Sequence, residues 1–263
     1  MRLRGFVVSI AALAALALPS SALAAFHLVE IEQVIGGVDG DTSAQAVQLR
    51  MRTAGQNLFS GAVRLRAWDA AGTNPVVLIA FSGANPASGV ACRRILVATP
   101  DFEFTTTPPL DAAAADYVMN TPIPASYLAA GSLTFENTAG TQIYWRLSWG
   151  GASYTGPGTV TTIAAGGNDA DGTMNPPFAG PLPSTGLEAV RFTPACATAP
   201  TTNLAHYALT VGAATFTAND LDAFVVTAGP EPVPIFPGAA GLALVGGLGA
   251  LAVGSAFLRR RAG

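Results

Sequence analysis

The chain contains no lysine, only two histidines and two cysteines, and charged residues make up 11% of its 263 positions. His27 and His206 are too few for a histidine-rich zinc site, and no Gly-x-Ser-x-Gly motif of the serine hydrolases occurs. A Ser–His–Asp site also needs a positioned base, which neither histidine offers in sequence. We therefore predict that the protein is not an enzyme and has no cofactor. A hydrolase with paired carboxylates is the least favoured alternative.

The N-terminal segment, residues 1–24, has the pattern of a secretory signal peptide. It begins with Arg2 and Arg4, continues with an apolar stretch at 6–18, and ends in the small-residue site Ala22-Leu23-Ala24. We expect the secretion machinery to export the chain and signal peptidase to cleave it there. An uncleaved N-terminal anchor is the alternative.

The C-terminal segment, residues 229–263, has three parts in a fixed order. A proline-flanked acidic residue comes first, an uncharged apolar run at 235–258 follows, and an arginine cluster ends the chain: Pro230, Glu231, Pro232; Arg259, Arg260, Arg261. A membrane-spanning helix needs roughly 20 apolar residues, and arginines favour the cytoplasmic side. The sequence predicts a transmembrane helix at 235–258, with residues 25–228 outside the inner membrane.

This tail resembles the PEP-CTERM sorting signal of Gram-negative bacteria. The resemblance covers about 34 residues and implies an exosortase-type processing enzyme as partner. It also implies release to the cell surface or the extracellular matrix. The apolar run is rich in glycine and alanine, which favours a transient anchor. A plain C-terminal membrane anchor is the alternative.

The segment between the two ends is acidic. Eight of the 13 arginines and 15 of the 16 acidic residues lie there, which gives a net charge of about −7. Such a charge argues against nucleic acid as a partner. Its two cysteines, Cys92 and Cys196, are predicted to form a disulfide, because an exported chain folds in an oxidising compartment. Two unpaired buried thiols are the alternative.

The ectodomain, residues 25–228, shows many short segments of alternating polarity bounded by glycine-rich turns. Strands are predicted at 28–35, 45–51, 62–68, 76–81, 94–98, 132–136, 142–149, 158–163, 188–192, 206–211, 213–217 and 222–227. This pattern is typical of an all-β sandwich, with a long inserted loop at 100–130. Alternation predicts one set in the core: Val29, Ile31, Ile35, Val47, Leu49, Val63 and Leu65. It predicts the other set in solvent: Glu30, Glu32, Gln48, Arg50, Arg64 and Arg66.

Several stretches of the ectodomain resemble the lamin-tail-like domains. They are the stretch 29–37 (VEIEQVIGG), residues 46–50 (AVQLR), residues 68–72 (WDAAG), Asp171-Gly172 and the stretch 202–209 (TNLAHYAL). The resemblance implies an immunoglobulin-like sandwich of the kind found on exported bacterial proteins. It implies no catalytic residues.

Two kinds of binding site are candidates. Tyr144 and Tyr154 are predicted to face outward, where aromatic rings can stack on sugars, while Trp145 and Trp149 share the alternation of a core face. Hard oxygen ligands for Ca²⁺ are offered by Asn168, Asp169 and Asp171, and more weakly by Asp39 and Asp41. Asp and Asn are equally ordinary turn residues, and neither segment completes a calcium-loop motif.

The sequence thus predicts an exported, non-catalytic structural or adhesive protein, displayed on the surface or released into the matrix of a Gram-negative bacterium. A module that binds carbohydrate, such as an extracellular polysaccharide, or another polymer is the alternative.

Overall fold

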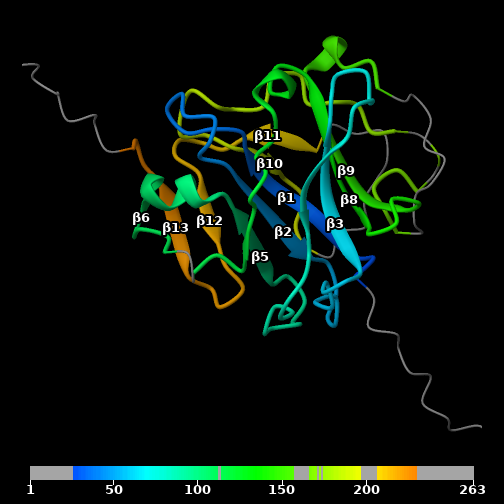
Figure 1. Ribbon diagram of the computed structural model, residues 1–263, viewed down its shortest axis with the longest axis vertical. Helices are drawn as coiled ribbons and strands as arrows, with labels where there is room; N and C mark the ends of the chain where they lie inside the picture. The colour runs from blue at the N-terminus through cyan, green and yellow to red at the C-terminus, as the bar shows by residue number, and fades with distance from the viewer. Residues whose placement is uncertain are drawn as a thin grey trace, which may run out of the picture. The chain divides into compact units, whose positions relative to one another are not determined.

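The computed structural model describes residues 26–111, 114–156, 166–170, 172, 174–196 and 206–229. These residues form an almost entirely β structure in which a six-stranded sheet lies between a four-stranded and a three-stranded sheet (Figure 1). The predicted all-β sandwich is confirmed at this level. The predicted signal segment 1–24, the strand 158–163 and the tail beyond Gly229 lie outside the described residues. Among the residues described, no helix is long and apolar enough to span a membrane.

The six-stranded sheet forms the middle layer. Its strands, in spatial order, are β11 (Tyr207–Leu209), β10 (Val190–Phe192), β1 (Val29–Ile35), β2 (Ala46–Met51), β5 (Arg94–Ala98) and β7 (Tyr117–Val118). Its pairs are antiparallel except β5 with β7. A β-bulge between Ile31 and Gln33 adds one residue to β1, so the alternation of this strand reverses at Glu32.

The four-stranded sheet packs on one face of the middle sheet. It consists of β4 (Val76–Ala80), β3 (Val63–Trp68), β8 (Gly131–Asn137) and β9 (Ile143–Trp149). The main core between the two sheets contains Val47, Leu65, Trp145 and Trp149, all fully buried. The core positions predicted from alternation are confirmed except Ile35, which the bulge turns to the opposite face.

The three-stranded sheet covers part of the other face of the middle sheet. It consists of β12 (Thr215–Thr217), β13 (Ala223–Val226) and β6 (Thr106–Thr107). A second core lies beneath it, with Ile35, Leu96, Phe102, Phe216 and Phe224. The predicted inserted loop at 100–130 is therefore structured. It supplies β6 and β7, together with the short 3-10 helices η2 (Pro100–Thr105) and η3 (Ala125–Tyr127). A further 3-10 turn, η4 (Gly151–Ser153), follows β9.

The prediction that one set of polar side chains faces solvent is wrong. Four of its six residues, Glu30, Glu32, Gln48 and Arg50, are at most 5% exposed. The other two, Arg64 and Arg66, are half-buried. The middle sheet carries structure on both faces, so its polar side chains meet protein instead of water. The backbone N–H of Thr217 on β12 donates to Gln48, and Arg50 donates to the carbonyl of Pro194. On the four-stranded sheet, Arg64 and Arg66 pair with the buried Glu136.

Candidate functional site

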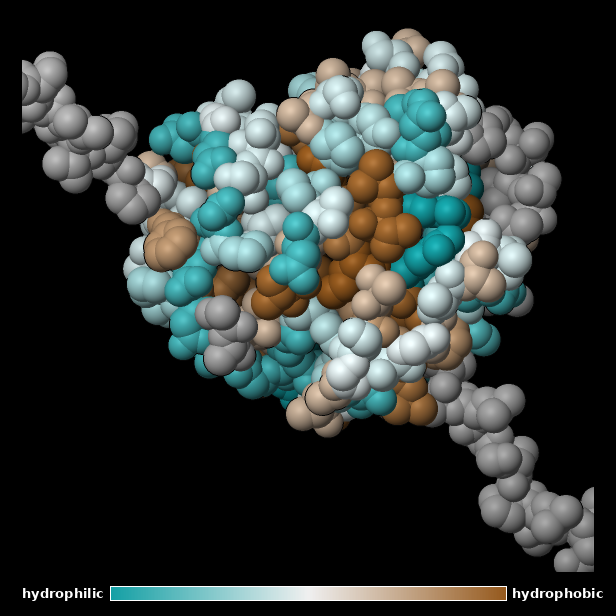
Figure 2. Space-filling view, viewed as in Figure 1, coloured by the Kyte–Doolittle hydropathy of each residue, from teal (hydrophilic) through white to brown (hydrophobic). Residues whose placement is uncertain are grey.

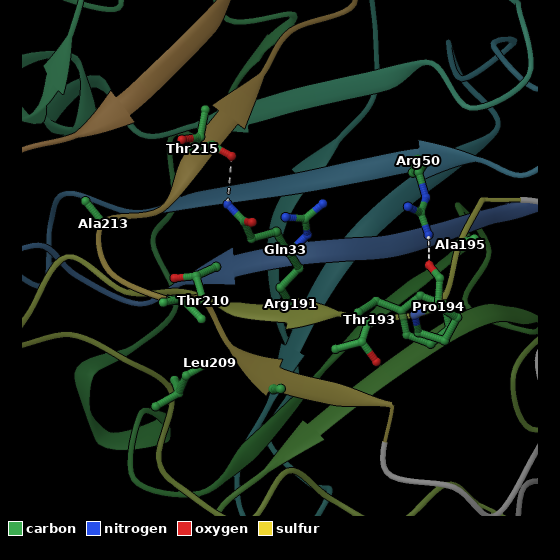
Figure 3. Close-up of a pocket in the computed structure, with 13 residues that line it drawn as sticks. Gln33, Arg50, Arg191, Thr193, Pro194, Ala195, Leu209, Thr210, Ala213 and Thr215 are labelled. Atoms are coloured by element: carbon green, nitrogen blue, oxygen red, sulfur yellow. Dashed lines mark hydrogen bonds between the residues drawn. The ribbon is translucent and has the colours of Figure 1, made fainter.

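A cavity of about 620 Å³ opens on the face of the middle sheet that the third sheet covers only in part. Its walls come from β1, β2, β10, β11 and β12 and from the segments that follow β10 and β11 (Figure 3). Ligand sites in proteins typically have volumes of roughly 300–1,000 Å³. This cavity is therefore large enough to hold a small molecule or one unit of a polymer.

Strand pairing brings the polar side chains of the cavity together. Gln33 on β1 and Arg191 on β10 are direct cross-strand partners, and their side chains lie side by side in Figure 3. The amide of Gln33 donates to the carbonyl of Thr215 on β12, 3.2 Å away. The bulge in β1 is what turns Gln33 to this face next to Glu32.

Glu32 is the centre of a buried charge network beneath the cavity. Its carboxylate is fully buried and accepts hydrogen bonds from Gln48 at 2.7 Å, from Arg50 at 2.9 Å and from Arg94 at 2.7 and 3.0 Å. Arg191 lies 3.8 Å from the same carboxylate, and 49% of its side chain is exposed. Burying a charged group is costly unless it is paired, so these arginines offset the cost of burying the Glu32 carboxylate.

Glu30 occupies a less favourable position in the same network. It pairs with Arg50, but its Oε2 atom is buried without a hydrogen-bond partner among the described residues. Burial raises the pKa of Glu30 to about 7, against the opposing effect of Arg50. Glu30 is therefore neutral in part of the molecules at neutral pH.

The disulfide holds one wall of the cavity. Cys92 and Cys196 are bonded, with their Cα atoms 5.6 Å apart, as the sequence predicts. The bond ties the segment after β10 to the chain beside β5, and Arg50 holds the same segment through Pro194. A covalent link and a buried arginine thus fix residues that line the cavity.

The predicted sugar-stacking tyrosines do not face outward. Tyr144 is 2% exposed and Tyr154 is 8% exposed, so the expectation of outward rings is wrong. A register shift between β8 and β9 near Phe135 and Glu136 inserts Tyr144 into the main core, where it packs against Phe135. The hydroxyl of Tyr154 donates to Ser132 at 3.1 Å.

The candidate calcium ligands have structural roles in the described chain. The side chain of Asn168 bonds both backbone groups of Arg146 on β9, and Asp169 accepts from the backbone of Asn175. Asp171 lies outside the described residues. In the first candidate loop, Asp41 accepts from Ser43 in an ordinary turn. No group of three His, Cys, Asp or Glu side chains suited to a metal ion occurs in the part of the chain that the structure describes.

Asp116 is a half-buried carboxylate outside this network, and it links the middle sheet to the hairpin of β12 and β13. Its Oδ2 atom accepts from the backbone N–H groups of Leu96 and Asn219, at 2.7 and 2.8 Å. Burial raises the pKa of Asp116 from 3.8 to about 6, although these hydrogen bonds oppose the rise. The folded state therefore binds this proton more tightly than the unfolded chain does.

We predict that Asp116 makes the fold more stable in mild acid. Its contribution is absent above pH 6, grows as the pH falls, and is complete below about pH 4, reaching about 1–3 kcal/mol. Asp116→Asn keeps an oxygen acceptor and removes the titration, so its free energy of unfolding should vary less between pH 4 and 6. Urea unfolding across this range checks it, with the exposed Asp101→Asn as the matched control. Identical slopes for Asp116→Asn and wild type would contradict the assignment.

Sequence reasoning found the charged residues of the network but not their setting. Alternation placed Glu30, Glu32 and Arg50 on one face and offered no sign that this face is covered. It did not single out Gln33 or Arg191. The excess of charged residues on two adjacent strands, in a chain with few charges, is the signal that points to a special role.

The two histidines lie in ring contacts. His27 packs against Phe26 and Tyr144, and His206 packs edge-on against Phe192. Neither histidine lies at the cavity, so the cavity, the disulfide and the sequences of the two ends are the features that bear on function. No family model matches the chain, and neither a curated protein nor a solved structure shows significant similarity to it.

Proposed function

We propose that this chain is an exported, non-catalytic structural or adhesive protein, displayed on the cell surface or released into the matrix. The disulfide is the observation that carries this proposal. It joins positions 104 residues apart and holds a wall of the cavity, so it belongs to the folded domain. Such bonds persist in oxidising compartments and are rare in the cytosol, which supports export.

The two ends of the chain support the same topology. The signal-peptide pattern at 1–24 and the arginines at 259–261 both favour a topology with residues 25–228 outside the inner membrane of a Gram-negative cell. The likeness of the tail to a PEP-CTERM signal supports processing by an exosortase-type enzyme near Pro230, Glu231 and Pro232. The tail then acts as a transient anchor and the ectodomain is the cargo.

The fold is proposed to be an immunoglobulin-like sandwich of the lamin-tail-like kind. The resembling stretches at 29–37 and 46–50 coincide with β1 and β2, and 68–72 begins at the end of β3. The third sheet is an addition to the two packed layers of such a sandwich. This likeness supports the scaffold and assigns no chemistry.

A non-catalytic role is supported by the use that the fold makes of its ionisable groups. Glu32 and Glu136 are held by arginines, and each histidine packs against aromatic rings. On the face shown in Figure 2, hydrophobic residues form a band across the middle with polar residues around it. Contiguous apolar surface with a polar rim is typical of interaction sites, which suits an adhesive protein.

We predict that a tag inserted in the ectodomain appears outside the inner membrane and is released in a shorter form. The comparison uses cells with and without the processing enzyme, read by fractionation and protease accessibility. A variant with Pro230, Glu231 and Pro232 all changed to alanine should stay in the inner membrane, as should the wild type without the enzyme. Retention of the full-length wild type in both cells would leave a plain anchor, and a cytoplasmic tag would overturn export.

A further inference from the structure

We propose that the cavity above Glu32 binds a carboxylate-bearing sugar, such as a uronic acid unit of an acidic polysaccharide, with Arg191 contacting the carboxylate. The inference deepens the proposed function and rests on it for the source of the ligand. The site itself stands on the geometry of the cavity.

The charge balance of the cavity favours an anion. The buried network at its base pairs three arginines with two glutamates: Arg50, Arg94 and Arg191 with Glu30 and Glu32, of which only Arg50 and Arg191 line the cavity. The cluster therefore carries at least one excess positive charge. Because burial raises the pKa of Glu30 to about 7, partial protonation of this carboxyl increases the excess near neutral pH.

Arg191 is the arginine that is available to a ligand. A guanidinium has five N–H donors in a planar fork. Within the described chain, the only ion pair of this side chain is the 3.8 Å contact with Glu32, and about half of it reaches solvent. Its outer donors can therefore hold a carboxylate in a bidentate pair, the strong form of arginine recognition. Arg50, by contrast, is fully engaged with Glu30, Glu32 and Pro194.

The rest of the cavity suits a sugar better than a bare anion. Gln33, Thr193 and Thr210 line it, and the hydroxyl of Thr193 already donates to the carbonyl of His206. The hydroxyl oxygen of Thr193 can in turn accept a hydrogen bond from a sugar hydroxyl, because its donation to His206 leaves its lone pairs available. Leu209 and Val211, 52% and 104% exposed, give the margin apolar surface for the C–H face of a ring.

The site is a local exception in an acidic domain. The segment between the two ends carries about −7 overall, yet two of its eight arginines, Arg50 and Arg191, line this cavity, and Arg94 pairs with Glu32 beneath it. None of the described residues that line the cavity is acidic. The acidic remainder weakens long-range attraction to a polyanion, so we expect recognition of single units rather than tight electrostatic coating.

Isothermal titration of the full-length chain, solubilised in a mild detergent, tests the proposal with three probes. D-Glucuronate combines carboxylate and hydroxyls, D-glucose has hydroxyls alone, and acetate has the carboxylate alone. The Kd for glucuronate should be at least ten-fold lower than for either other probe. Arg191→Gln should raise that Kd at least ten-fold, while Arg93→Gln, the same charge change outside the cavity lining, should leave it unchanged.

Each other outcome overturns the inference in a defined way. Equal affinity for acetate would make the cavity a simple anion site, and equal affinity for glucose would remove the role of Arg191. No glucuronate binding, or unchanged binding by Arg191→Gln, would remove the site. These results are independent of the tagged-export experiment, because a chain that is exported but does not bind glucuronate fails this inference alone.

Discussion

Replacing both Cys92 and Cys196 with serine is expected to lower the free energy of unfolding by about 4–5 kcal/mol. The disulfide closes a loop of 104 residues, and cross-linking a loop of that size removes a large conformational entropy from the unfolded chain. For a domain of about 200 residues, this loss corresponds to a fall in Tm of roughly 10 °C or more. Thermal and denaturant unfolding of the double variant measure it.

A reductant provides the control for the disulfide. It should lower the Tm of the wild type to that of the double variant and leave the variant itself unchanged. Peptide mapping without reduction should recover the peptides of Cys92 and Cys196 as one linked species. Two free thiols in exported protein, or a double variant as stable as the wild type, would contradict the prediction.

Arg50→Met is expected to destabilise the fold by about 3–5 kcal/mol. Methionine fills a similar volume, but it leaves Glu30 buried without its arginine and removes one of the donors to Glu32. Removing one partner of a buried ion pair leaves an uncompensated charge, which is the costly case. Since the pKa of Glu30 is already raised to about 7, the variant can neutralise this group in mild acid. The destabilisation should therefore be smaller at pH 5.5 than at pH 8.

Arg94→Met is the matched control for the network. Arg94 also contacts Glu32, but 30% of its side chain is exposed, and Glu32 keeps Arg50 and Gln48 when Arg94 is lost. Its cost in urea unfolding should be clearly smaller than that of Arg50→Met. Equal costs, or an Arg50→Met variant within about 1 kcal/mol of the wild type, would show that burial of the network contributes little.

Local patterns in the sequence were enough for most of the strands. Alternation located β1, β2, β3, β8 and β9 to within two residues at each end, because side chains of a strand point to opposite faces with a period of two. The same pattern placed Trp145 and Trp149 in the core. The pairing of Cys92 with Cys196 was predicted because the chain has only two cysteines and its N-terminus has the pattern of an export signal.

The candidate site could not be predicted in this way. Its residues are brought together from β1, β2, β10 and β12, and the contact of Thr217 with Gln48 joins positions 169 apart. Nothing local says whether the second face of a sheet meets water or another sheet. The same polar side chains are compatible with a solvent-exposed face and with a covered one. The third sheet, which covers part of this face, determines that they are buried.

The sequence by itself determined that the domain is built of β-strands, which side chains form its main core and which cysteines pair. These properties follow from the period of polar and apolar residues along the chain and from its composition, both of which can be read from neighbouring positions. Only the tertiary structure decided that Glu30, Glu32 and Arg50 are buried, that Ile35 and Tyr144 change faces, and that Arg191 stands at a cavity. The physical reason is that bulges and an added sheet reset exposure through contacts between distant segments, and burial then changes the charge state and the partners of each polar group.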